Sequence, residues 1–356
     1  MVESGEIVVL GMFDLTRLDG AMSVRIYNIY QALRSLTPTT LLAGNRSSRR
    51  MATLRFLRQG GLGRTRAIYV EASNGPSNET DLLFLTLARS RGIPILVFIP
   101  DAYQLFPDIF PRSGWKAKLI DWGWRYCINT YLRVADVLLF PSWGLAAYFS
   151  DGRAKALLPP AGTLGLDYAP PVFSPPTIVY AGGATYRYGS DLLLDAMVQV
   201  VARFPNARCR LITNQDEFIA GHPARHAAWL TVEPRTFDEL PEIMRSATLT
   251  VISLRSNPYN DLAVPVKLFD YMSFGRAVVA TACRDTTLLL EQLEAGLVVD
   301  DTVESLAQGI IYLLENPDLT ARLGLNGYQA IQMAHSWKHR AKRLLELVDE
   351  IECDRC

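Results

Sequence analysis

Short apolar runs alternate with helical patterns along the whole of this 356-residue chain. Each apolar run predicts a buried strand, and the pattern after it predicts a helix that crosses back to the next parallel strand. This alternation is typical of a doubly wound α/β domain. In the first half, strands are predicted at 7–13, 39–43, 67–71, 94–99 and 137–140, and helices near 22–35, 48–58, 79–91 and 113–133.

The second half repeats this alternation, and the chain is too long for one compact core. We therefore predict two Rossmann-like domains, residues 1–165 and 172–335, followed by an amphipathic helix over residues 336–352. Six prolines between residues 159 and 176 predict a linker at the join. Ligands of such domains bind at the carboxyl ends of the strands, so we expect a site in a cleft between the two sheets. The strands of the second domain are predicted near 177–181, 208–213, 230–233, 249–253, 277–281 and 297–299.

Composition predicts a soluble cytoplasmic protein. Hydrophobic residues make up 49% of the chain and charged residues 20%, as in ordinary globular proteins. The N-terminus lacks the basic and apolar regions of a signal peptide, and the longest uncharged runs are too short to span a bilayer. Cys353 and Cys356 have C-x-x-C spacing, but no second pair or nearby histidine completes a metal site, so free thiols are expected.

The basic residues are concentrated in the first half, although the formal net charge of the chain is zero. Residues 1–170 carry 19 basic and 13 acidic side chains, and residues 20–70 contain nine arginines but no acidic residue. Such a run is a solvated basic face or a surface for an anionic partner, such as a membrane or a phosphate-bearing substrate.

Several ligand classes are excluded by missing motifs. The first strand-to-helix turn contains Gly11 and Gly20 but no G-x-G-x-x-G fingerprint, and the chain has no P-loop. All four histidines fall in the second half, and His222 and His226 flank Pro223, which predicts a surface loop rather than a metal centre. No metal, no cofactor and no nucleic-acid partner is therefore expected.

The stretch "NDLAVPVKLFDYMSFG", residues 260–275, predicts a short helix that begins after Pro265 and ends at Gly275. Lys267 and Asp270 lie one turn apart on one face of this helix. The two side chains are either part of a solvated helix end or a binding site for a charged ligand.

Together with its flanking segments, this stretch resembles the donor-binding corner of the group 1 family of retaining glycosyltransferases, which have the GT-B fold. The resemblance covers nearly the whole chain. It extends to "GAMSVRIYNIYQAL" near the N-terminus, "VADVLLFPS" at the end of the first domain, "IVYAGGATYRYGSDLLLDAM" at the start of the second, and "SWKHRAKRLL" in the helix that crosses back to the first domain.

The resemblance implies that Asp270 binds the ribose hydroxyls of a nucleotide sugar. A carboxylate suits this role because it accepts charge-assisted hydrogen bonds from two adjacent hydroxyls. Lys267 and Arg255 are the implied partners of the diphosphate, although a solvated lysine is an equal alternative. The family has a second acid where this chain has Leu262, and Asp261 is the nearest substitute. Val264 lies in the same donor-binding segment.

The first loop of the second domain departs from the family pattern. Gly183 stands where the family has an arginine and Tyr188 where it has a lysine. Gly182 begins this loop, and Arg187 is its remaining cation. We expect Arg187, Lys267 and Arg255 to hold the diphosphate together, the alternative being that catalysis is impaired. Lys267 and Arg187 are assigned to catalysis as well.

In the first domain, the resemblance places the backbone amides of Gly20 and Ala21 against the donor phosphate, since they begin a helix. The family's sugar-binding histidine is missing, because no histidine precedes His222. Asp101 follows the fourth predicted strand, where it either orients and deprotonates the acceptor hydroxyl or caps the next helix. Glu71 is a weaker candidate of the same kind.

Two helical segments of the first domain combine basic residues with large apolar ones. "NRSSRRMATLRFLRQ" contains five arginines, and "WKAKLIDWGWRYCINTYLR" places Trp115, Trp122 and Tyr126 beside Lys118 and Arg125. These patterns fit either core packing or the interface of an anionic membrane. Attachment to the inner face of the cell membrane would suit a lipid-linked acceptor.

These observations predict a glycosyltransferase that moves a sugar from a nucleotide-sugar donor to an acceptor hydroxyl with retention. The acceptor would be a sugar or a lipid-linked sugar in the synthesis of a cell-surface polysaccharide or glycolipid. Two alternatives remain: a nucleotide-sugar epimerase or hydrolase on the same fold, and a catalytically silent partner that binds nucleotide sugars.

Overall fold

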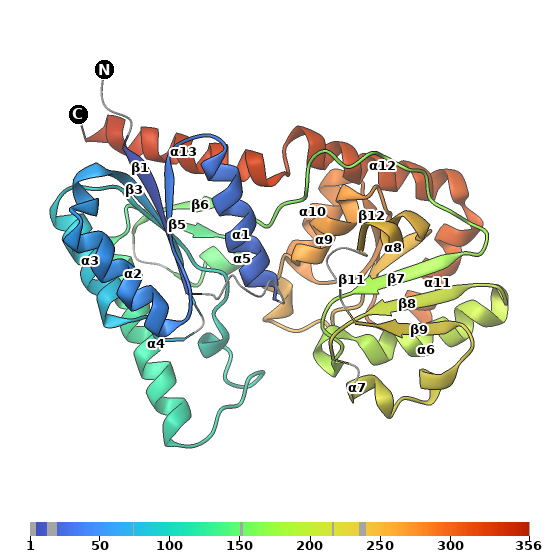
Figure 1. Cartoon of the computed structure of the whole chain (residues 1–356). Helices are drawn as coiled ribbons and strands as arrows, with labels where there is room; N and C mark the ends of the chain where they lie inside the picture. The colour runs from blue at the N-terminus through green and yellow to red at the C-terminus, as the bar shows by residue number, and fades with distance from the viewer. Residues whose placement is uncertain are drawn as a thin grey trace. The chain divides into compact units, whose positions relative to one another are not determined.

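A computed structural model of the chain describes residues 5–12, 20–73, 75–149, 152–215, 217–234 and 240–355. The chain divides into two compact units (Figure 1). Unit 1 comprises Met1–Pro159 and Trp337–Cys356, and unit 2 comprises Pro160–Ser336. The end of the first predicted strand, at residue 13, and Cys356 lie outside the described residues.

Unit 1 contains a six-stranded parallel sheet in the order β2-β1-β3-β4-β5-β6. The first five strands confirm the predicted ones. β1, β3, β4 and β5 are largely buried, whereas only Leu42 of the edge strand β2 is buried. The sixth was not predicted, because it is a short edge strand that contains Lys155 and is only partly buried. The strands are β1 (Glu6–Gly11), β2 (Thr39–Leu42), β3 (Thr65–Glu71), β4 (Ile95–Phe98), β5 (Val137–Phe140) and β6 (Ala154–Leu157).

Helices connect these strands, and the last helix of the chain packs against α1. The apolar face predicted for this last helix comprises Leu344, Leu345, Leu347, Val348 and Ile351. Leu345 is half-buried and the other four are buried. The elements are α1 (Ala21–Arg34), α2 (Arg46–Arg58), η1 (Gly61–Arg64), α3 (Glu79–Ser90), η2 (Tyr103–Leu105), α4 (Trp115–Val134), α5 (Trp143–Ala146) and α13 (Trp337–Asp354).

Unit 2 contains a second six-stranded parallel sheet, in the order β12-β11-β10-β7-β8-β9. All six of its strands coincide with predicted apolar runs. Two hydrophobic clusters of this unit include residues from its strands. The strands are β7 (Thr177–Ala181), β8 (Arg208–Ile212), β9 (Leu230–Glu233), β10 (Leu249–Ile252), β11 (Val278–Thr281) and β12 (Gly296–Val299).

The helices of unit 2 include the one predicted from "PVKLFDYMSFG", which forms as α9 with Pro265 at its N-cap. His222 and His226 bracket a short 3-10 turn, as expected for a loop. The helical elements are η3 (Tyr186–Tyr188), α6 (Ser190–Arg203), α7 (Glu217–Ala220), η4 (Pro223–His226), α8 (Leu240–Ser246), η5 (Asn260–Leu262), α9 (Val266–Ser273), α10 (Arg284–Leu293), α11 (Val303–Glu315) and α12 (Pro317–Met333).

The proline-rich segment 160–176 is bound to unit 2 rather than acting as a free tether. Arg276 is fully buried and donates to the carbonyl oxygens of Ala169 and Ala247. Burial lowers the pKa of Arg276 to about 10, so the guanidinium still carries its charge at neutral pH. Tyr328 adds a hydrogen bond to the carbonyl oxygen of Leu166, 2.7 Å away. The prolines therefore interrupt regular structure without making the segment a loose linker.

A buried charge cluster holds together the centre of unit 1. Arg25 on α1 and Glu71 at the end of β3 are both fully buried, with Nε and Oε1 2.9 Å apart. The Arg25 guanidinium stacks 3.6 Å from the Phe98 ring centroid and donates to the carbonyl oxygen of Leu158. Burial raises the pKa of the Glu71 carboxyl, and Arg25 opposes that rise.

Removing one member of this pair leaves the other charge buried without its partner. We expect Arg25→Met and Glu71→Leu each to lower the free energy of unfolding by roughly 3–5 kcal/mol. The double variant Arg25→Met/Glu71→Leu should lose less than the sum of the two, because neither charge then remains buried. Urea unfolding of all three variants measures this coupling, and additive losses would contradict it.

Gly189 is the point where α6 meets the end of β10. Its φ is +64°, and a Cβ built there would lie 1.7 Å from the carbonyl oxygen of Ser253. We expect Gly189→Ala to lower stability by roughly 3 kcal/mol or more, from the left-handed backbone together with the backbone clash. Gly165→Ala is the matched control, since its φ is +82° and no atom lies within 4 Å. The control should lose only about 1–2 kcal/mol in the same unfolding experiment.

Candidate active site

The strand order of unit 2 reverses between β7 and β10, and this reversal selects one end of the sheet as a binding site. In doubly wound sheets, the connections that leave two such strands diverge at their carboxyl ends and open a crevice. The predicted donor residues of unit 2 all lie on the connections after these two strands, or on α9 at their end: Gly182, Gly183 and Arg187 after β7, and Arg255, Asp261, Val264, Lys267 and Asp270 after β10.

Lys267 extends from the first turn of α9 over the end of β7. Its Nζ lies 3.8 Å from the centroid of the Tyr180 ring. A Cβ at Gly182, where φ is +143°, would lie 2.8 Å from this Nζ, so the glycine leaves the space that the ammonium group occupies. The half-buried side chain thus lies against the strand end, and a fully solvated lysine is excluded by this geometry.

Two cations lie beside the Tyr188 ring at the same strand end. Its ring centroid is 5.6 Å from Lys267 Nζ and 5.5 Å from the Arg187 guanidinium. The Arg187 guanidinium also lies 4.9 Å from the ring centroid of Tyr259. A Cβ at Gly183 would lie 2.6 Å from the Tyr188 ring, so a larger residue there would displace this ring. Tyr188, which stands where the family has a lysine, is therefore an aromatic ring beside two cations.

Arg255 differs from the other two cations because it is ion-paired. Its Nη2 lies 2.6 Å from Oδ2 of Asp191, in the first turn of α6. Its guanidinium also lies 4.5 Å from the Tyr186 ring centroid. This pair joins the connection after β10 to α6, and the carboxylate offsets the charge that Arg255 was predicted to offer a diphosphate.

Asp270 shares its half-buried face of α9 with Lys267. The intervening Leu268 and Phe269 are fully buried, as is Tyr271, which follows Asp270. The Tyr271 hydroxyl accepts a hydrogen bond from the backbone N–H of Ala181, 2.8 Å away, and so fixes α9 to the end of β7. Because the buried face of α9 is anchored in the core, the face that carries Lys267 and Asp270 lies toward the strand ends.

The missing second acid has a structural explanation. Leu262 is buried, with 5% of its surface exposed, so its position serves the core. The carboxylate of Asp261 accepts from the backbone N–H of Arg284, 3.2 Å away, at the start of α10. Asp261 is thus engaged in holding this helix end. Val264 is half-buried nearby, and the carbonyl oxygen of Ala263 accepts from Thr286.

The predicted site residues of unit 1 lie on the connections after β1 and β4 and at the end of β3. Gly20 precedes α1, and its carbonyl oxygen accepts from the Ser23 hydroxyl, 2.8 Å away. Among the described residues, a Cβ there would meet this hydroxyl at 3.9 Å, and the Gly20 N–H donates to the same hydroxyl, 3.3 Å away, while Ala21 is the first residue of the helix. Asp101 is half-buried three residues after β4. Glu71 is not available to an acceptor, because it is buried against Arg25.

Sequence reasoning missed the aromatic part of the site. Tyr180, Tyr188 and Tyr259 contact the two cations, yet the only sequence signal was the density of tyrosines in "ATYRYG", which includes Tyr188 but neither Tyr180 nor Tyr259. Within the part of the chain that the structure describes, no group of three or more His, Cys, Asp or Glu side chains is arranged to hold a metal ion.

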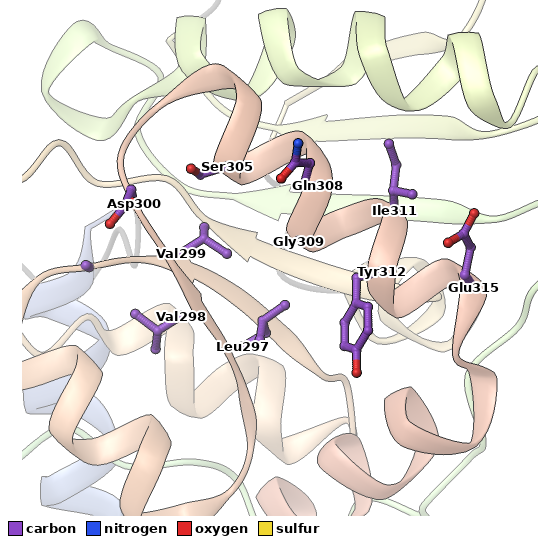
Figure 2. A pocket seen from close by; sticks show the side chains of 11 residues that line it. Leu297, Val298, Val299, Asp300, Ser305, Gln308, Gly309, Ile311, Tyr312 and Glu315 are labelled. Carbon is purple, nitrogen blue, oxygen red and sulfur yellow. The ribbon is translucent and has the colours of Figure 1, made fainter.

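A separate pocket lies between β12 and α11 (Figure 2). Its lining has no basic side chain but includes Asp300 and Glu315, so it would repel a diphosphate. None of the predicted donor residues lines it. Its lining residues are Ala282, Leu297, Val298, Val299, Asp300, Ser305, Gln308, Gly309, Ile311, Tyr312 and Glu315.

Most of unit 2 matches a known protein family. Residues 175–316 match the sequence profile of the family "Glycosyl transferases group 1". No curated protein matches the sequence. The matched region begins two residues before β7 and ends just after α11, so it includes every predicted donor residue of unit 2.

Solved structures match the whole chain in fold. Sucrose-phosphate synthase from Thermosynechococcus elongatus has 15% sequence identity and a TM-score of 0.71, covering 98% of this chain and 100% of that one. HepE from Anabaena, in complex with UDP and glucose, has 13% identity and a TM-score of 0.70, covering 97% and 100%. WaaG, a glycosyltransferase involved in lipopolysaccharide biosynthesis, has 11% identity and a TM-score of 0.65, covering 96% and 99%.

The two parallel sheets, the helix that returns to unit 1 and the profile match agree with the expectation from the motifs. This chain has the GT-B fold, and its residues 175–316 match the group 1 glycosyl transferase family.

Proposed function

We propose that the protein transfers a sugar from a nucleotide-sugar donor to an acceptor hydroxyl, with retention of the anomeric configuration. Unit 2 would bind the donor and unit 1 the acceptor. The observation that carries the proposal is the arrangement at the end of β7, where Lys267 and Arg187 lie at one tyrosine ring and Asp270 shares the helix face of Lys267.

The chemistry of this arrangement suits the departure of a nucleoside diphosphate. As the bond between the sugar and the diphosphate breaks, negative charge grows on the phosphate oxygen, and cations already in place stabilise it. Lys267 is held over Gly182, and Arg187 over Tyr188 and Tyr259, so neither side chain has to be recruited from solvent. The departing phosphate oxygen then takes the proton of the incoming hydroxyl, which attacks the same face of the sugar.

Asp270 would accept hydrogen bonds from the two ribose hydroxyls, and Asp101 would orient the acceptor. Complexes of HepE with UDP and with UDP-glucose make the uridine nucleotides the first donors to test here. WaaG is involved in lipopolysaccharide biosynthesis, and the likeness to it supports a lipid-linked acceptor and a role in cell-surface polysaccharide or glycolipid synthesis. Such an acceptor would place the protein at the inner face of the cell membrane.

The reaction itself is tested by incubating the full chain with a panel of nucleotide sugars, with and without a membrane lipid extract. We expect nucleoside diphosphate to be released only when the acceptor extract is present. Release without an acceptor would replace the proposal by a hydrolase or epimerase, and binding without release would indicate a silent binding partner.

The ribose contact is tested with Asp270→Asn. Asparagine can still accept hydrogen bonds but without charge assistance, so both UDP and uridine binding should weaken by roughly 10- to 100-fold, since a charge-assisted bond contributes about 1 kcal/mol more than a neutral one. Isothermal titration measures both ligands. Asp318→Asn is the control, because Asp318 is an exposed carboxylate on α12. Equal affinities in the two variants would remove Asp270 from the site.

The phosphate contact is tested with Lys267→Met, which should weaken UDP binding but leave uridine binding unchanged. Transfer should slow by about 100-fold or more, since the ammonium stabilises charge that develops as the bond breaks. Arg322→Met is the control, because Arg322 is an exposed cation of the same unit. Weaker binding of uridine itself would show that Lys267 supports the fold of the site instead of contacting phosphate.

A further inference from the structure

Helix α4 of unit 1 is much longer than the strand that precedes it. Its 20 residues span about 30 Å, whereas the four residues of β4 span about 13 Å. The residues of α4 that are buried all lie between Trp124 and Val134. The first turns of the helix therefore extend past the carboxyl edge of the sheet, and Figure 1 shows α4 projecting from the body of the unit.

The projecting part carries a stripe of large apolar side chains. Trp115, Leu119, Trp122 and Tyr126 follow one another at helical spacing, with exposed fractions between 56% and 71%, and Ile120 beside them is 43% exposed. The Trp122 and Tyr126 rings stack, with centroids 6.0 Å apart. Core packing was one interpretation of this aromatic pattern, and the exposure of these side chains contradicts it. Such a continuous exposed patch marks an interaction surface.

Cations border the stripe. Lys116, Lys118 and Arg125 are exposed on the same turns, and within the described residues none of the three is ion-paired with a carboxylate. The Lys116 ammonium lies 5.7 Å from the Trp115 ring centroid. Asp121, the only acid among residues 112–126, is paired with Arg112. The patch is therefore both apolar and positively charged.

The arginine-rich run of residues 20–70 does not form a comparable surface, contrary to the simplest interpretation of its charge. Arg25 and Arg49 are buried against Glu71 and Asp81. Four more of the nine arginines are ion-paired: Arg46 and Arg50 with Glu79, Arg64 with Glu6, and Arg66 with Asp349 and Glu352. Phe56 of α2 is buried as well. Most of this positive charge is neutralised within unit 1, which leaves α4 as the stronger candidate.

We propose that residues 112–126 dock unit 1 on the surface of an anionic lipid bilayer. Tryptophan and tyrosine rings partition into the headgroup region, the leucine and isoleucine reach the acyl boundary, and the lysines attract anionic headgroups. Two copies of the patch would bring like charges together, so charge complementarity favours an anionic surface over self-association. No helix within the described ranges is long and apolar enough to cross a membrane, which makes surface attachment the relevant mode.

The position of the patch connects docking to the proposed reaction. Because α4 begins at the carboxyl edge of the sheet, docking places the strand ends of unit 1 near the headgroups. A lipid-linked acceptor would be presented at this edge, a step that rests on the proposed function, whereas lipid binding itself does not.

The test is sedimentation of the full chain with vesicles, in the absence of nucleotide sugar. Vesicles of phosphatidylcholine containing about one third phosphatidylglycerol should bind the protein, and pure phosphatidylcholine should bind it at least tenfold more weakly. Trp115→Ser/Trp122→Ser and Lys116→Glu/Lys118→Glu should each lower the partition coefficient about tenfold or more. Added salt should weaken binding of the parent chain.

Matched controls come from unit 2. Leu288→Ser/Tyr312→Ser removes two comparably exposed apolar side chains, and Arg245→Glu/Arg322→Glu reverses two exposed cations; both should bind anionic vesicles like the parent. Circular dichroism and UDP affinity should be unchanged in all four variants. Equal binding to neutral vesicles, or unchanged binding by both α4 variants, would overturn the proposal. A dimer in light scattering that the Trp115→Ser/Trp122→Ser variant dissociates would assign the patch to a second copy instead.

Discussion

The reversal of strand order between β7 and β10 is the constraint on which the candidate site depends. Because β8 lies on one side of β7 and β10 on the other, the connections after β7 and β10 diverge at the same end of the sheet. Gly182 to Gly189 form one connection and Ser253 to Pro265 the other, and α9 follows the second. Gly189 packs directly on the carbonyl oxygen of Ser253, so the two connections are held in van der Waals contact. Everything the site offers a donor is positioned by this junction.

The junction of the two connections explains why Gly183 and Tyr188 depart from the family pattern. Cations that would come from the connection after β7 are replaced in part by Lys267, which reaches the same strand end from α9. The replacement needs a surface that fixes a flexible side chain, and the rings of Tyr180 and Tyr188 supply it. It also needs room for the Tyr188 ring, which Gly183 leaves, since a Cβ there would lie 2.6 Å from that ring. A tyrosine in place of lysine and a glycine in place of arginine are therefore parts of one rearrangement.

Much of the fold could be predicted from the sequence, because buried parallel strands are apolar on both faces and stand out as runs. Eleven of the twelve strands in the described ranges coincide with such runs, and the exception, β6, is an edge strand with Lys155 in its centre. The positions of Lys267 and Asp270 on one helix face also followed from spacing alone. What contacts them did not follow, because cation–aromatic packing depends on residues that are far apart in sequence, such as Lys267 and Tyr180.

The distribution of surface charge was the property that the sequence predicted least well, because ion pairs form between residues that are far apart in sequence. An acid-free run of nine arginines suggests a basic surface, but the carboxylates that neutralise most of it come from β3, α3, α13 and the N-terminus of the chain. The segment around Trp115 carries fewer cations, yet its lysines have no such partners among the residues that the structure describes, and they stand beside exposed aromatic rings. Binding to an anionic membrane depends on unpaired cations beside exposed apolar side chains rather than on the total number of basic residues. For this chain, that criterion selects the first turns of α4 over the arginine-rich helix α2.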